Sequence, residues 1–309
     1  MKRLILENVS SSRDQWLALR NGKVSSSVIS VIAGLNTYKS PLQLWAEWTG
    51  KVTDSFRGND MTDLGCFLEP YVGKLYGKRA GKAVRSCDSL FAHKDIDWAI
   101  ATPDFWIGDG EDALLETKTG TVRQFQRWAD EETPDEYVVQ LQWQMGVCGV
   151  ESGAIAAMLG GDPGNLITRE FHFDPELFST MLELADNFLQ RVKSDTPPEA
   201  GANDGELITK LIKRDGSTFV FDEEREHLVS PYFDELVELR ERKSELEQEM
   251  KKLDAQIRAN ENNLKAASVA TEMAFRDGRR YRVKRIEVAE RTMSAYAYDR
   301  VYLLHTGRD

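Results

Sequence analysis

The sequence is poor in the residues that build disulfide frameworks and soft-metal sites. Its 309 residues include three cysteines and four histidines. Cys66, Cys87 and Cys148 are odd in number and widely spaced, which fits neither a disulfide framework nor a zinc or iron–sulfur site. The scattered histidines argue against a histidine-based metal centre. We therefore expect a protein of the reducing cytoplasm.

Long apolar runs and positive net charge are also missing. No run of 18 apolar residues predicts a membrane span, and Met1–Arg3 leads into no apolar region typical of secretion. The net charge of −11 argues against indiscriminate adhesion to nucleic acid. Basic residues nevertheless outnumber acidic ones in the first 60 residues and after Met273, so an acidic protein could still carry a local basic track.

Helical and strand-like periods alternate over the first 200 residues. With 41% hydrophobic residues, the chain can form one large domain, or a domain with an extension. Periodicity and end signals predict several helices, at about 10–20, 25–34, 40–50, 61–76, 137–147 and 175–193. Strands are expected at 83–92, 98–107, 113–119, 153–159 and 167–173. This order predicts an α/β domain with a mixed central sheet flanked by helices.

The last third has a different pattern. Residues 195–204 have the composition of a linker. Beyond them, seam positions recur at alternating spacings of three and four, namely Leu236, Leu239, Lys243, Leu246, Met250, Leu253, Ile257, Asn260 and Leu264. This heptad pattern predicts a long coiled-coil-like helix at about 232–267, and its two polar seam residues favour a specific pairing. A basic β-hairpin region follows. We divide the chain into domain 1–200 and extension 201–309.

A cluster of acidic residues and one lysine stands in ATPDFWIGDGEDALLETKTG, residues 101–120. The Asp109–Gly110 pair between two strand-like runs predicts a hairpin, and Asp109 fits the turn itself. Glu116 and Lys118 point the same way because strand side chains alternate faces, and Asp104 can converge on them. Carboxylates at this density suit magnesium, and Lys118 could orient a water or stabilise a phosphoryl transition state. The alternative is an exposed hairpin with an ordinary ion pair.

Several segments in order resemble the lambda exonuclease and YqaJ-like viral recombinase family, a branch of the PD-(D/E)xK nucleases. The matching segments are WLALRNG at 16–22 with Ser27, GCFLEP at 65–70, TPD at 102–104, LETK at 115–118 and YVVQLQWQ at 137–144. Each is weak alone, but their order and spacing are specific. The resemblance implies a PD-(D/E)xK, restriction-endonuclease-like core over the first 200 residues. Short members of the family end near residue 200.

The resemblance assigns a metal site and a catalytic lysine. Asp104 and Glu116 would be the principal ligands, with Glu69 reaching the metal from the preceding helix. The backbone carbonyl of Thr117 would be a further ligand, and Lys118 would position the hydrolytic water. The plain alternative for Glu69 is a solvated residue on a helix face.

Four further positions match the substrate-binding parts of the family pattern. Arg20 and Ser27 would hold a terminal 5′-phosphate, while Gln140 would lie at the edge of the active site. Gln144, one helical turn on, could assist from the same face. Arg20 could instead be a structural ion-pair partner, Ser27 a helix cap and Gln140 an ordinary amide at the edge of the core.

The implied function is a magnesium-dependent exonuclease, with manganese as a substitute, that degrades double-stranded DNA 5′→3′. In the resembled family such resection feeds recombination with a single-strand-annealing protein, and the enzymes form rings, which implies a homo-oligomer and specifically a trimer. A phage or prophage origin would fit. Two alternatives stay open. One is a structure-selective or site-specific endonuclease on the same core, and the other is a non-catalytic DNA-binding scaffold that recruits an annealing protein.

Overall fold

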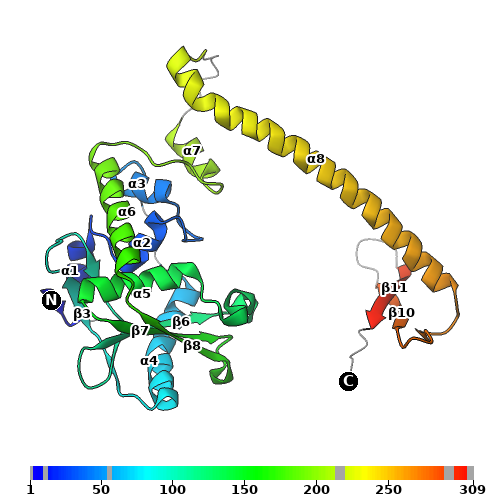
Figure 1. The fold of residues 1–309 in the computed structure, drawn as a ribbon, viewed down its shortest axis with the longest axis horizontal. Helices are drawn as coiled ribbons and strands as arrows, with labels where there is room; N and C mark the ends of the chain where they lie inside the picture. The colour runs from blue at the N-terminus through cyan, green and yellow to red at the C-terminus, as the bar shows by residue number, and fades with distance from the viewer. Residues whose placement is uncertain (1–2, 10–12, 54–57, 213–219, 289–295, 305–309) are drawn as a thin grey trace. The chain divides into compact units, whose positions relative to one another are not determined.

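The computed structural model describes residues 3–9, 13–53, 58–212, 220–288 and 296–304 (Figure 1). The chain divides into two compact units, residues 1–215 and 216–309, and each is described by itself. None of the described helices is both long and apolar enough to cross a membrane.

A five-stranded mixed sheet forms the centre of the first unit. Its strands, in spatial order, are β2 (Val84–Ser86), β5 (Phe105–Ile107), β6 (Ala113–Gly120), β7 (Ser152–Leu159) and β8 (Leu166–His172). Strands β6 and β7 run parallel, and the other neighbours are antiparallel. The predicted mixed α/β architecture is confirmed, and β6, the strand with the acidic cluster and Lys118, is the middle one.

Helices cover both faces of this sheet (Figure 1). On one face lies α4 (Asp60–Ala80), whose Val72 and Tyr76 pack with Leu115. The other face is covered by α2 (Ser26–Ile32), α5 (Asp135–Cys148) and α6 (Pro175–Lys193), which share a core with Leu114. Helix α3 (Pro41–Trp48) completes this layer. Successive residues of β6 thus face opposite cores, as the pleat requires.

A second, three-stranded sheet lies beside the first. It has the order β1 (Arg3–Glu7), β3 (Ser89–Ala92) and β4 (Ile100–Ala101), and β1 was not predicted from the sequence. Helix α1 (Arg13–Arg20) packs against it through partly buried Trp16 and Leu19.

Two predicted strands were wrong in extent, because each divides between the two sheets. The run 83–92 forms β2 and β3, and the run 98–107 forms β4 and β5. The chain leaves one ladder and joins another at Thr102–Asp104, where the Asp104 carbonyl accepts a hydrogen bond from the Cys87 amide at 2.8 Å. Strand propensity does not indicate which sheet a residue joins. The break places Asp104 just before β5, at the edge of the five-stranded sheet.

The first unit continues past the predicted linker. Helix α7 (Gly205–Leu211), which was not predicted, packs on the core through Leu207, Ile208 and Leu211. The carboxylate of Asp204 accepts a hydrogen bond of 2.5 Å from Ser40 at the start of α3.

The second unit contains the predicted long helix and a small sheet. Helix α8 (Glu223–Ala266) begins earlier than expected, where Asp222 caps it by accepting a hydrogen bond from the Arg225 amide at 2.9 Å. The sheet has the order β11 (Tyr296–Leu304), β10 (Arg280–Val288) and β9 (Glu272–Ala274), all antiparallel. The turn between β9 and β10 places Gly278 at φ 90°, where glycine is favoured.

Candidate active site

Glu116 and Lys118 project from β6 toward helix α5, as their spacing predicted. The Lys118 ammonium donates hydrogen bonds to Glu116 Oε1 and, at 2.8 Å, to Gln140 Oε1. Gln144, one turn further along α5, donates from Nε2 to Glu116 Oε2 at 2.8 Å. Two glutamines of one helix therefore hold the lysine and the carboxylate of one strand.

Asp104 approaches the same strand from the chain break before β5. Its Oδ2 accepts a hydrogen bond from the Thr117 amide at 2.8 Å and another from the Thr117 hydroxyl at 3.0 Å. These two bonds fix the carboxylate against β6. The structure thus brings Asp104 and residues 116–118 together.

Glu69 reaches the site from α4. Glu69 and Asp104 line one pocket of 470 Å³, together with Trp16 and Thr102. Close packing of α4 on β5 makes this approach possible. One turn beyond Glu69, a Cβ added at Gly73 would lie 2.7 Å from Cζ of Phe105, so only glycine permits this packing.

The electrostatics of the cluster show carboxylates that destabilise one another. Burial, and then the charge of Glu116, raises the pKa of Glu69. Burial, Glu116 and Glu69 raise the pKa of Asp104 well above its ordinary value, against the opposing effects of Lys118 and the Thr117 amide. Burial lowers the pKa of Lys118, but Glu116 and Asp104 outweigh that effect and raise it, so the lysine is cationic. One lysine faces three acids, and a further cation would relieve the excess negative charge.

Two observations bear on whether these residues fit a metal ion. Within the described residues, no three His, Cys, Asp or Glu side chains stand together as a ready-made metal cage. In this arrangement hydrogen bonds occupy both oxygens of Glu116 and one oxygen of Asp104. The donor set nevertheless fits a hard divalent cation, because it consists of mutually repelling carboxylates. In addition, the buried Oε1 of Gln144 has no hydrogen-bond partner beside Glu116.

Arg20 and Ser27 also come together, with a third residue that the sequence analysis missed. Arg20 Nη2 lies 2.8 Å from Ser25 Oγ and 3.4 Å from Ser27 Oγ, and the two hydroxyls are 3.2 Å apart. The guanidinium also stacks on the Trp16 ring at 4.3 Å. Burial lowers the pKa of Arg20 to about 10, which leaves it cationic at neutral pH. We call Arg20, Ser25 and Ser27 the anchor cluster.

The anchor cluster connects to β6 through α2 and α5. Ser26 Oγ lies 3.4 Å from Gln144 Nε2, and Ser30 Oγ lies 3.4 Å from Gln140 Nε2. The serine-rich segment 25–30, whose sequence signal is only that of a helix start, therefore faces the same glutamines that hold Glu116 and Lys118.

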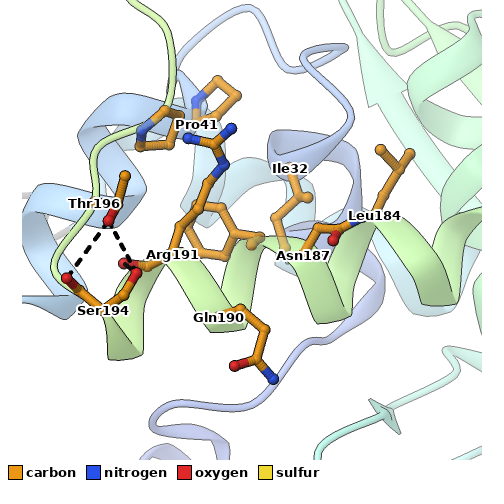
Figure 2. A pocket seen from close by; sticks show the side chains of 10 residues that line it. Ile32, Pro41, Leu184, Asn187, Gln190, Arg191, Ser194 and Thr196 are labelled. Atoms are coloured by element: carbon orange, nitrogen blue, oxygen red, sulfur yellow. Dashed lines mark hydrogen bonds between the residues drawn. The ribbon is translucent and has the colours of Figure 1, made fainter.

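A separate pocket of 690 Å³ lies beside the C-terminal half of α6 (Figure 2). Figure 2 shows Arg191, Asn187 and Gln190 around it, with Ile32 from α2 and Pro41 from α3. It contains none of the predicted site residues, so the residue chemistry points to the pocket of Glu69 and Asp104 instead.

Sequence comparisons find a family model and a relative that are similar to part of this chain. Residues 15–151 match the family model of the YqaJ-like viral recombinase domain. The protein YqaJ of Bacillus subtilis (strain 168) is 34% identical over 182 residues, which cover 58% of this chain and 56% of that protein. The chain thus spans about half the length of this relative.

Solved structures show the same fold. The alkaline exonuclease LHK-Exo of Laribacter hongkongensis aligns with a TM-score of 0.51 and 22% identity, covering 59% of this chain and 94% of its own. LHK-Exo in complex with dAMP aligns with a TM-score of 0.50 and 21% identity over the same shares. The resemblance inferred from the sequence motifs is confirmed: residues 15–151 are similar to the YqaJ-like viral recombinase domain, and the first unit shares the fold of the alkaline exonuclease LHK-Exo.

Proposed function

We propose that the first unit is a metal-dependent deoxyribonuclease that degrades double-stranded DNA from its 5′ ends. The observation that carries this proposal is that Glu116 bonds Lys118 on β6, while Asp104 bonds the intervening Thr117 and shares a pocket with Glu69 of α4. Hydrolysis of a phosphodiester requires the barrier to fall by roughly 15–20 kcal/mol. A magnesium ion held by the three carboxylates, with manganese as a substitute, would supply an acidified water and charge stabilisation at the phosphoryl oxygens.

The residues of the chain have distinct roles in this proposal. Lys118 directs its ammonium toward the attacking water or the developing negative charge. Glu116 and Gln140 fix the position of the Lys118 ammonium, so that little reorganisation is needed during the reaction. Thr117 holds Asp104 through its amide and hydroxyl, and its carbonyl would be a further metal ligand. No cysteine or histidine takes part.

The anchor cluster supports an exonuclease that begins at a phosphorylated 5′ end. A partly buried guanidinium beside two hydroxyl groups is a suitable site for a terminal phosphate. A single-stranded product would serve an annealing protein in recombination. A ring of copies, implied by the family resemblance, would keep the enzyme on its DNA.

One set of substrates tests this proposal. Linear, nicked and covalently closed DNA with defined 5′ ends is incubated with and without magnesium. We expect metal-dependent loss of linear duplexes from 5′-phosphorylated ends and an intact closed circle. Cutting of the closed circle would establish the endonuclease alternative, and no cutting of any substrate would establish the scaffold.

A matched pair of lysine variants tests the assigned chemistry. Lys118→Ala should abolish hydrolysis while DNA affinity stays within about threefold of the wild type. Lys82→Ala removes a surface lysine whose partner is Glu170, at 2.7 Å, and should leave hydrolysis unchanged. Retained hydrolysis by Lys118→Ala would contradict the role of Lys118.

A further inference from the structure

Helix α8 exposes a continuous apolar seam. Its 44 residues include none that is buried in the described part of the chain. Leu239, Met250 and Leu253 are 59%, 61% and 55% exposed, and Leu246 is 48% exposed. The nine seam positions, from Leu236 to Leu264, alternate in steps of three and four along the whole stretch.

This seam requires a partner with the same geometry. Most helical stability in proteins comes from packing an apolar face rather than from helix propensity. A period of 3.5 residues differs from the wider apolar stripe of a helix on a globular core, and it keeps the seam in contact only with another helix that supercoils around it. The small sheet of the second unit bonds α8 through Tyr281, which donates to the Leu264 carbonyl at 3.2 Å, and it leaves every described residue of α8 at least partly exposed.

We propose that α8 pairs with α8 of a second copy of this chain, as a parallel, in-register, two-stranded coiled coil. Leu239, Leu246 and Leu253 occupy the second seam position of successive heptads, and Ile257 occupies a first position; leucine at the second position with a β-branched residue at the first favours two parallel strands. Each would face its own copy. The two Asn260 side chains would likewise meet and satisfy each other's amide groups.

Charges beside the seam fit this pairing. In the parallel register, Glu235 lies opposite Arg240 of the second copy, and Arg242 lies opposite its Glu247. Each attractive pair occurs twice by symmetry. Glu249 opposite Asp254 is an unfavourable pair, and so is Lys243 opposite its own copy in the seam; counted by symmetry, four attractive contacts outnumber three repulsive ones.

One antiparallel arrangement would also pair Arg240 with Glu247, but it would place seam residues of different kinds opposite each other. It places the charged Lys243 against Leu246 and the polar Asn260 against Val229. The parallel register instead keeps the leucine layers apolar and confines the two polar seam residues to layers of their own. This separation of polar and apolar layers selects the parallel copy.

A single cysteine in the seam tests the pairing in the full chain. Cys66, an exposed cysteine, is first replaced by serine. In this background, Leu253→Cys should form a disulfide-linked two-chain species under oxidation, at least tenfold more than Ala255→Cys on the outer face of the helix. Adding Leu246→Glu should reduce that species at least tenfold. The pairing is overturned if Leu253→Cys forms no more two-chain species than Ala255→Cys, as an antiparallel partner or a different protein on the seam would cause.

A variant that should strengthen the pairing distinguishes a loss of pairing from misfolding of the chain. Lys243 is a charged residue at a seam position, so Lys243→Leu should lower the protein concentration for half-maximal cross-linking of Leu253→Cys by tenfold or more. Lys252→Leu, outside the seam, is the matched control and should leave that concentration unchanged. Equal effects of the two substitutions would also overturn the proposal, which does not depend on the nuclease activity.

Discussion

Replacing Gln144 by leucine should reduce hydrolysis without reducing stability. Gln144 is 1% exposed, and its Nε2 lies 2.8 Å from Glu116 Oε2. A hydrogen bond to a charged group contributes about 1.5–3 kcal/mol. If Glu116 must keep its orientation in the transition state, the loss corresponds to a fall of about 10- to 150-fold in kcat/KM. The same substitution removes the buried Oε1 that has no partner, which offsets the lost bond in the folded state.

Gln142 on the same helix supplies the matched control. It is 4% exposed, donates to the His172 carbonyl at 2.8 Å and accepts from the Asp174 amide at 2.9 Å. Gln142→Leu leaves both backbone groups without these partners, at about 1–3 kcal/mol each. We expect it to lower the melting temperature by several degrees and to leave kcat/KM within about threefold.

The assay is single-turnover digestion of a 5′-phosphorylated duplex across a magnesium titration, together with magnesium binding by calorimetry. Gln144→Leu should weaken binding as well as hydrolysis, because Glu116 would lose its fixed orientation. The reasoning is refuted if a folded Gln144→Leu protein hydrolyses DNA within twofold of the wild type. It is equally refuted if Gln142→Leu loses as much activity as Gln144→Leu.

Three further predictions follow from the same contacts. Arg20→Ala and Ser25→Ala should each reduce the preference for 5′-phosphate over 5′-hydroxyl duplexes at least tenfold. Ser27→Ala should reduce it less, because the Ser27 hydroxyl lies 3.4 Å from the guanidinium and the Ser25 hydroxyl 2.8 Å. Equal digestion of both duplexes by the wild type would exclude the anchor role. Gly73→Ala should cost about 1–3 kcal/mol in stability and weaken magnesium binding. Phe105→Leu added to this variant should restore part of the stability and part of the magnesium affinity. If neither is restored, the Phe105 ring is not what opposes the added methyl group. Magnesium at 100 times its Kd should stabilise the fold by about 2.7 kcal/mol, with the shift in melting temperature lost in Glu116→Gln; an unchanged shift would place the ion elsewhere.

The sequence predicted the contacts that follow from strand alternation and from helical spacing. Glu116 and Lys118 share a face because the period of a strand is two, and the heptad steps predicted α8. Gln140 and Gln144 share a face of α5 because they are one turn apart, and both contact the pair on β6.

Contacts that depend on tertiary packing could not be predicted from the sequence. Nothing in the local sequence shows that the run 98–107 changes sheets before Asp104, because strand propensity is the same in either ladder. Ser25 has the sequence signal of a helix start, yet its hydroxyl accepts from Arg20 across a turn. From the sequence, Gly73 only lowers the helix propensity of its segment; the structure shows that the Phe105 ring leaves no room for a side chain there.

The position of β6 in the sheet has a consequence for how heat would affect the protein. Residues 113–115 pair with strands on both sides, residues 116–120 pair with β7, and residues 114–117 are buried, so we expect the strand to open only when the whole unit unfolds. The helix that supplies Arg20 rests on a small peripheral sheet through a few partly buried side chains. Mild heating should therefore erase discrimination between DNA termini before it stops bond cleavage, and slow hydrogen exchange should map to the strand of Lys118.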